Sequence, residues 1–130
     1  MNPDELLAKA RRALESALIL QAAGDPDGAC NRAYYAMFDA AKAALVATAS
    51  DGSSAKTHSG LISAFSKRFV ATGGVARELG KAFNRVGELR QAADYTGAPL
   101  PNDKAAWALT QAENFVAAVE LLLRGRIPSP

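Results

Sequence analysis

Apolar residues recur along most of the chain at alternating steps of three and four positions, the repeat of a helix with one buried face. The clearest series repeats in heptad fashion near the C-terminal end: Ala105, Leu109, Ala112, Val116, Val119 and Leu123. Gly and Pro residues separate the apolar segments and end them. The pattern predicts five helices, at about 3–23, 25–48, 57–72, 75–95 and 102–124. No strand pattern competes, and short links predict an all-α, antiparallel up-and-down bundle of four to five helices.

Local signals support the first helix and the division of the chain. Asn2 is placed to cap that helix, Pro3 suits its first position, and Glu5 lies where a capping box needs a carboxylate. The 130 residues match the usual size of one domain. We expect a single domain over 1–126, a loose tail at 127–130, and a flexible Gly/Ser loop at 50–55.

Composition excludes several classes of protein. No apolar run reaches the roughly 18–20 residues that a membrane span needs, and the start of the chain lacks the pattern of a signal peptide. We therefore expect a cytoplasmic protein. The single cysteine, Cys30, cannot form an internal disulfide, and we expect it to be a small buried residue. The sequence has no Gly-rich phosphate loop and no Cys/His cluster, so we expect no cofactor and no metal.

Charge is distributed unevenly along the chain. The net charge is +2, but the segment from Lys56 to Arg90 has seven basic residues and two acidic ones, a net +5, and the remainder carries −3. Within this segment Arg77, Lys81 and Arg85 are spaced by four and share one side of a helix. Such a row is either an ordinary solvated face or a surface that follows phosphates.

Arg90 and Asp94 are the first of three further candidate groups. They are four residues apart on one helix and can form an ion pair, which is either structural or orients Arg90 toward a phosphate. The single histidine, His58, stands near a helix start; a surface or capping role is usual there, and a catalytic role would need an Arg brought beside it by the fold.

The third group contains two adjacent tyrosines. Tyr34 and Tyr35 point about 100° apart on a helix, so one can lie in the core while the other reaches a groove. Arg32 lies one turn before Tyr35 and near Asp39, which predicts a partly buried Arg32–Asp39 ion pair. Packing of these side chains together with that ion pair, without a groove, is the alternative.

Four motifs in order resemble the small, stand-alone HEPN proteins of bacteria and archaea, and together they extend over nearly the whole chain. They are Arg32-Ala33-Tyr34-Tyr35-Ala36-Met37-Phe38, Lys56-Thr57-His58-Ser59-Gly60, Arg90-Gln91-Ala92-Ala93-Asp94-Tyr95 and Ala112-Glu113-Asn114-Phe115. The resemblance implies an antiparallel helical bundle, a homodimer, and pairing with a minimal nucleotidyltransferase as a toxin–antitoxin pair.

Many HEPN toxins are metal-independent ribonucleases whose signature is an Arg followed, after four to six residues, by a His. Arg90 matches that Arg, but the following positions hold Tyr95, Thr96 and Gly97. The resemblance therefore implies the fold and the dimer without the ribonuclease activity. Two further roles for these residues are open. His58 could complete the Arg90 site from another helix or from the second subunit, or the nucleotidyltransferase partner could adenylylate Tyr95.

The leading hypothesis is a HEPN-type binding module that acts with a nucleotidyltransferase and binds nucleotide or RNA phosphates. The predicted phosphate ligands are Arg90, Arg32, Arg77, Lys81 and Arg85. The predicted groove and orienting residues are Asp94, Tyr95, Tyr35 and Asp39. The first alternative is a metal-independent ribonuclease toxin that uses Arg90, His58 and Tyr95. The second is a purely structural helical dimer that docks a partner protein.

Overall fold

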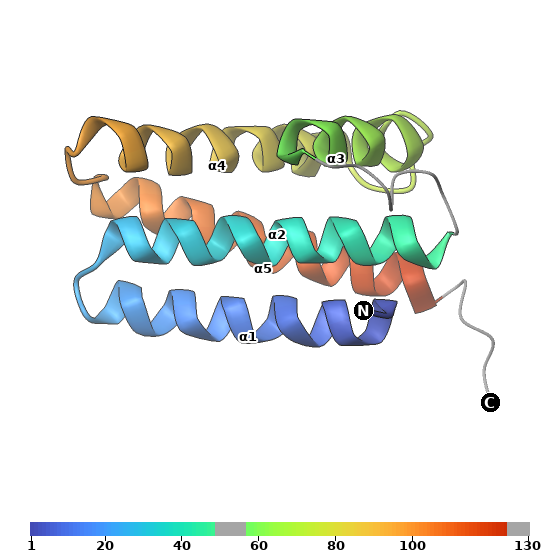
Figure 1. The fold of residues 1–130 in the computed structure, drawn as a ribbon, viewed down its shortest axis with the longest axis horizontal. Coiled ribbons are helices and arrows are strands. Elements are labelled where there is room, and N and C mark those ends of the chain that lie inside the picture. Colours follow the sequence, from blue (N-terminus) through green and yellow to red (C-terminus); the bar gives the residue numbers. More distant parts are fainter. Residues whose placement is uncertain (49–56, 125–130) are drawn as a thin grey trace.

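The computed structural model describes residues 1–48 and 57–124, and these residues form an all-helical bundle (Figure 1). The elements are α1 (Pro3–Ala22), α2 (Pro26–Ala47), α3 (His58–Phe65), the π-helix η2 (Ser66–Val70), α4 (Arg77–Thr96) and α5 (Asn102–Arg124). The predicted fold class and five helical segments are confirmed. The Gly/Ser loop at 50–55 and the tail at 127–130 lie outside the described residues.

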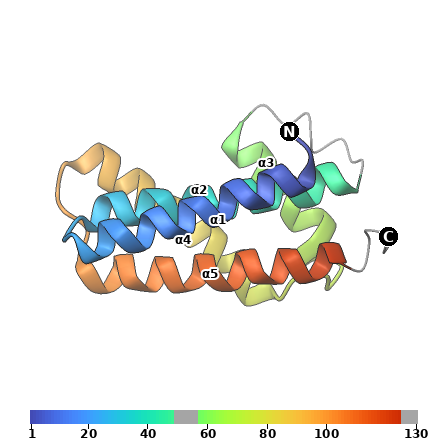
Figure 2. The ribbon, with the colours of Figure 1, turned by 90° about the horizontal axis from the view of Figure 1, so that it is seen from below.

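Helix α2 is the centre of the bundle. It packs against α1, α5, α4 and α3, and Figure 1 shows it between α1 on one side and α4 on the other. Figure 2 shows α5 running along the bundle beside α1. Seven alanines of α2 are fully buried: Ala29, Ala33, Ala36, Ala40, Ala41, Ala43 and Ala44. Their small side chains let the neighbouring helices approach closely.

Aromatic rings fill the space that the alanines leave. Phe65 and Phe69 contact each other, and Phe65 also contacts Phe83 and Phe115. The six residues of the predicted heptad series on α5 are buried as well. This core joins α3, η2, α4 and α5, and so it fixes the position of α3 against α4.

The helix starts follow the local sequence. Asn2 and Glu5 form the predicted capping box: the Glu5 backbone N–H donates to the Asn2 side chain, and the Asn2 backbone N–H donates to the Glu5 carboxylate. The side chain of Asp25 accepts from the Gly28 N–H, and that of Thr57 accepts from the Gly60 N–H. Each bond satisfies a backbone donor that the first helical turn leaves without a partner.

The third predicted helix differs from the expected continuous segment at 57–72. Its α-helical part ends at Phe65, and the next turn is η2, in which the Ala71 N–H donates to Ser66 O at 2.9 Å. The Val75 N–H then donates to Phe69 O at 3.0 Å, and α4 begins at Arg77 rather than at 75. The wider turn keeps both Phe65 and Phe69 in the core. Among the described helices, none is both long and apolar enough to cross a membrane.

Candidate functional site

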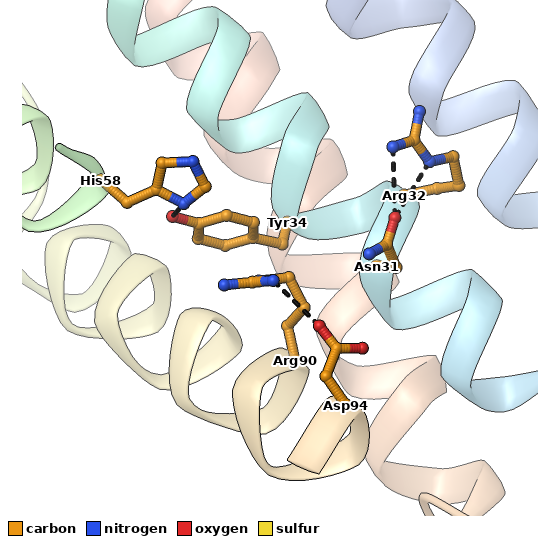
Figure 3. Close-up of polar contacts among 6 residues, drawn as sticks. All are labelled: Asn31, Arg32, Tyr34, His58, Arg90 and Asp94. Atoms are coloured by element: carbon orange, nitrogen blue, oxygen red, sulfur yellow. Dashed lines mark hydrogen bonds and ion pairs between the residues drawn. The ribbon is translucent and has the colours of Figure 1, made fainter. Parts of the chain in front are cut away.

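Tyr34 stands at the centre of the candidate site (Figure 3). Its ring, on α2, is 1% exposed, and its hydroxyl oxygen lies 3.2 Å from Nδ1 of His58 at the start of α3. His58 also packs on Phe38, with the ring centroids 4.6 Å apart. Because Thr57 caps α3 through its side chain, the first residue of the helix is held in place against α2.

Arg90 of α4 approaches the same tyrosine from its face. The guanidinium carbon lies 4.9 Å from the centre of the Tyr34 ring and 5.7 Å from the centre of the Tyr35 ring. Nη1 donates to Oδ2 of Asp94 at 3.0 Å, as the sequence predicted (Figure 3). The Arg90 side chain is 14% exposed, and its buried Nε has no hydrogen-bond partner among the described residues. A stacked, partly buried guanidinium is held in one orientation with donors to spare.

A pocket of about 170 Å³ joins these groups between α2, α3 and α4. Its lining residues are Tyr34, His58, Ser59, Ile62, Asn84, Gly87, Glu88, Arg90 and Gln91. Gly87 lacks a side chain where one would crowd the tyrosine, since a Cβ there would lie 3.2 Å from Cε1 of Tyr34. The pocket thus offers a guanidinium, an imidazole, the carboxylate of Glu88 and several neutral polar groups around one small volume.

The electrostatics of the pocket keep its two central rings neutral. Burial, and then the positive charge of Arg90, lower the pKa of His58. Burial raises the pKa of the Tyr34 hydroxyl, although Arg90 acts in the opposite direction. A neutral His58 can accept a hydrogen bond from the Tyr34 hydroxyl at Nδ1, and it then carries its own hydrogen on Nε2.

The structure separates the two adjacent tyrosines as predicted. Tyr34 is buried, whereas Tyr35 is half-buried and has two guanidinium groups near its ring, those of Arg90 and Arg32. The Arg32 carbon lies 5.3 Å from the Tyr35 centroid. Two of the predicted phosphate ligands therefore flank one ring at the edge of the site.

The expected Arg32–Asp39 ion pair is wrong. Arg32 donates to Oδ1 of Asn31 from Nε at 3.3 Å and from Nη2 at 3.1 Å, and the ion pairs among the described residues do not include Asp39. The two residues are seven positions apart, about two helical turns. Asp39 is 6% exposed, its pKa is raised by burial, and it does not line the Arg90 pocket.

None of the three residues of the basic row lines the Arg90 pocket. Arg77 and Lys81 line a depression of about 330 Å³ against η2, and Asn84 lines both this depression and the Arg90 pocket. Arg85 points elsewhere and pairs with Glu88 at 3.1 Å in an exposed contact.

Tyr95 does not lie where it was expected. Its side chain is 87% exposed near the end of α4, and it is not among the residues that line the Arg90 pocket. Instead, His58 lies at the hydroxyl end of the Tyr34 ring, and Arg90 lies over the ring (Figure 3). The structure brings together Arg90 and His58, but it does not bring Tyr95 to either of them.

Sequence reasoning missed several polar groups of the pocket. Ser59, Asn84 and Gln91 were not among the candidates, and the groove position was assigned to Tyr35, whereas Tyr34 lines the pocket. The spacing of 84, 88 and 91 along α4 was an available signal, since these positions share a helix face. Within residues 1–48 and 57–124, no group of three or more His, Cys, Asp or Glu side chains is arranged to hold a metal ion.

Comparison with known proteins agrees with this arrangement of helices and motifs. Residues 4–122 match the family model described as the HEPN domain. The chain belongs to the HEPN family. This HEPN chain is 37% identical to a UPF0332 protein of Thermotoga maritima, over 88% of the chain and 86% of the relative.

Two further relatives are more distant in sequence. A UPF0332 protein of Gloeobacter violaceus is 36% identical over 75% of this HEPN chain and 77% of its own length. A protein of Methanocaldococcus jannaschii named "Putative toxin MJ0142" is 35% identical over 71% of this chain and 60% of its own length.

Proposed function

We propose that this HEPN protein is a toxin-like module that binds a phosphate group of a nucleotide or RNA in the pocket between α2, α3 and α4. One observation carries the proposal: Arg90 and His58 are both held on Tyr34 and line the same pocket. Asp94 occupies one guanidinium nitrogen, and Arg90 keeps other N–H donors for a phosphate. His58 can add a donor from its ring.

The cellular role follows from the relatives and is part of the same proposal. Proteins of Methanocaldococcus jannaschii with 35% and 33% identity carry names that call them toxins with the qualifier "putative". The HEPN resemblance adds a homodimer and a nucleotidyltransferase partner. Arg32 beside Tyr35, and Arg77 and Lys81 beyond Asn84, would then extend the phosphate-binding surface outward from Arg90.

A binding measurement tests the site assignment. Fluorescence anisotropy of a labelled single-stranded RNA, and competition by a mononucleotide, would be compared for wild type and Arg90→Ala. Charge-assisted hydrogen bonds contribute about 1.5–3 kcal/mol, so we expect Arg90→Ala to weaken binding by about 10- to 150-fold. Arg90→Lys keeps the charge but loses the planar fork of donors, so its affinity should lie between those of wild type and Arg90→Ala.

Arg12→Ala is the matched control, because Arg12 is an exposed residue of α1 and does not line the pocket. It removes the same charge and should leave affinity nearly unchanged. Equal losses in Arg90→Ala and Arg12→Ala would show that only net charge matters. Unchanged binding in folded Arg90→Ala would overturn the assignment of the phosphate to this pocket, and the absence of any binding by wild type would favour a structural helical dimer.

A second function, a metal-independent ribonuclease, is favoured by the position of His58. In the tautomer in which Nδ1 donates to the Tyr34 oxygen, Nε2 of a neutral His58 is free to act as a general base, with Arg90 stabilising charge that develops on the phosphate. Tyr95, at 87% exposure, would act only if a second subunit brought it to the site.

Cleavage of total RNA in the presence of a chelator separates this function from binding alone. A ribonuclease predicts cleavage by wild type that is lost in both Arg90→Ala and His58→Ala, together with growth arrest on expression. Dimeric wild type that binds RNA without cleaving it would restrict the function to binding.

A further inference from the structure

A second groove lies between α4 and α5, apart from the Arg90 pocket. Two adjoining depressions of about 440 and 350 Å³ share Arg85 of α4 and Trp107 of α5. Leu89 and Lys104 line the first, and Lys81 and Gln111 line the second. The groove therefore runs along the contact of the two helices with one indole and one guanidinium at its middle.

Trp107 is unusual among the aromatic residues of this chain. It is 40% exposed, and the ring and cation contacts of the described residues do not include it. By contrast, Arg90 already stacks on Tyr34 and Arg32 on Tyr35. An exposed indole face in a groove is a surface on which a flat ligand can stack.

Basic side chains surround this indole on both walls. Lys81 and Arg85 come from α4, and Lys104 comes from α5 one turn before Trp107. Glu78 and Asp103 also line the groove, so the three basic and two acidic side chains give it a net charge of +1. The ion pair of Arg85 with Glu88 is exposed and contributes little, so it leaves the guanidinium available to a stronger partner.

Shared lining residues connect the groove with the Arg90 pocket around the surface of α4. Lys81 lines both the Trp107 groove and the depression beside η2, and Asn84 lines both that depression and the Arg90 pocket. A flexible strand with repeated phosphates could follow this path, whereas a mononucleotide could occupy only one end of it. An exposed ring among cations is the combination that single-stranded nucleic acid uses.

We propose that the α4–α5 groove binds single-stranded RNA, with one base stacked on Trp107 and the flanking phosphates on Lys81, Arg85 and Lys104. The choice of RNA rests on the proposed function, and it extends that function from one phosphate to a strand. The structure thereby assigns a role to Arg85, the member of the basic row that lines neither the Arg90 pocket nor the depression beside η2.

Trp107 is the only tryptophan of the chain, so its emission reports on this groove directly. The full chain would be titrated with a single-stranded oligouridylate, with an RNA duplex of the same charge, and with polyglutamate. We expect saturable quenching by the single strand and little by the other two. No quenching by the single strand, or equal quenching by all three, would overturn the proposal.

Salt dependence tests the three cations. Each phosphate contact to a single strand contributes a slope of about −0.7 in log K against log salt, so three contacts predict about −2. The double variant Lys81→Ala/Arg85→Ala should reduce the steepness of this slope to about −0.7. A slope unchanged by the double variant would exclude these side chains as phosphate ligands.

Substitution of the ring tests stacking. Base–aromatic stacking predicts that Trp107→Ala weakens RNA binding, measured by anisotropy, by about 5- to 150-fold, and that Trp107→Phe weakens it less. Equal losses in both variants, or none, would contradict stacking. An emission spectrum that shifts with protein concentration alone would show that copies of the chain bury this face, and would also overturn the proposal.

Arg90→Ala separates this inference from the proposed function. If RNA still quenches Trp107 while Arg90→Ala binds mononucleotide as wild type does, the Arg90 assignment fails and the groove stands. If mononucleotide binding depends on Arg90 but RNA never quenches Trp107, the groove fails and the proposed function stands.

Discussion

Replacing Tyr34 with Phe removes one hydroxyl group from the centre of the pocket and leaves the ring in place. The ring is 1% exposed and supports the Arg90 guanidinium, so packing and the cation–π contact should survive. What is lost is the hydrogen bond between the hydroxyl and Nδ1 of His58, at 3.2 Å. The variant therefore isolates the bond that joins α2 to α3 within the site.

The expected cost follows from that single bond. A neutral hydrogen bond contributes about 0.5–1.5 kcal/mol net, and His58 is only partly buried, so water can replace the lost partner. We expect Tyr34→Phe to lower the free energy of unfolding by about 1 kcal/mol, or the Tm by about 3–5 °C. Tyr34→Ala also empties a buried volume and should cost about 3–5 kcal/mol.

Urea unfolding followed by circular dichroism measures these differences, and Tyr35→Phe is the matched control. The Tyr35 hydroxyl has no hydrogen-bond partner among the described residues, so its removal should change stability little. In a His58→Ala background the cost of Tyr34→Phe should vanish. Equal costs for the two tyrosines, or a full cost without His58, would refute the assignment of this bond.

Three further predictions concern pH and packing. Burial and Arg90 hold the folded-state pKa of His58 below its ordinary value of 6.5. Its contribution to stability is therefore present above pH 6.5 and lost as pH falls through the folded pKa. Urea unfolding at a series of pH values should show this loss of stability, and His58→Gln should reduce the loss. Burial raises the folded pKa of Asp39 above 3.8. The contribution of Asp39 to stability is therefore present below pH 3.8 and lost as pH rises through the folded pKa. Asp39→Asn should stabilise the chain at neutral pH and have a smaller effect in acid, which the same urea assay measures. Gly80→Ala would place a Cβ 2.9 Å from Cγ2 of Val70. The overpacking should cost about 1–3 kcal/mol and exceed the helix-propensity gain of about 1 kcal/mol, so the urea midpoint should fall. Adding Val70→Ala should restore the midpoint.

Local signals explain why the bundle could be predicted from the sequence. The apolar repeat on α5 marks the buried face, and Asn2 with Glu5 marks the start of α1. The Arg90–Asp94 contact was also predictable, because residues four apart on a helix are neighbours. These features depend on positions close together in the chain.

Features that depend on tertiary packing could not be predicted in this way. The π-helix arises where Phe65 and Phe69 both enter the core, and no local motif marks it. His58 and Arg90 are 32 positions apart, and only the packing of α3 and α4 on α2 brings them to Tyr34. Trp107 was likewise not connected to the basic row, because it lies on a different helix.

A phosphate that binds in the pocket formed by Arg90 and His58 should change the titration of His58, the single histidine of the chain. Its pKa can be followed by proton NMR of the imidazole ring, with and without uridine 3′-monophosphate. A phosphate bound beside His58 should raise the lowered pKa toward and above 6.5, and Arg90→Ala should abolish this ligand-dependent rise. A pKa that is the same with and without saturating nucleotide in wild type would contradict the account.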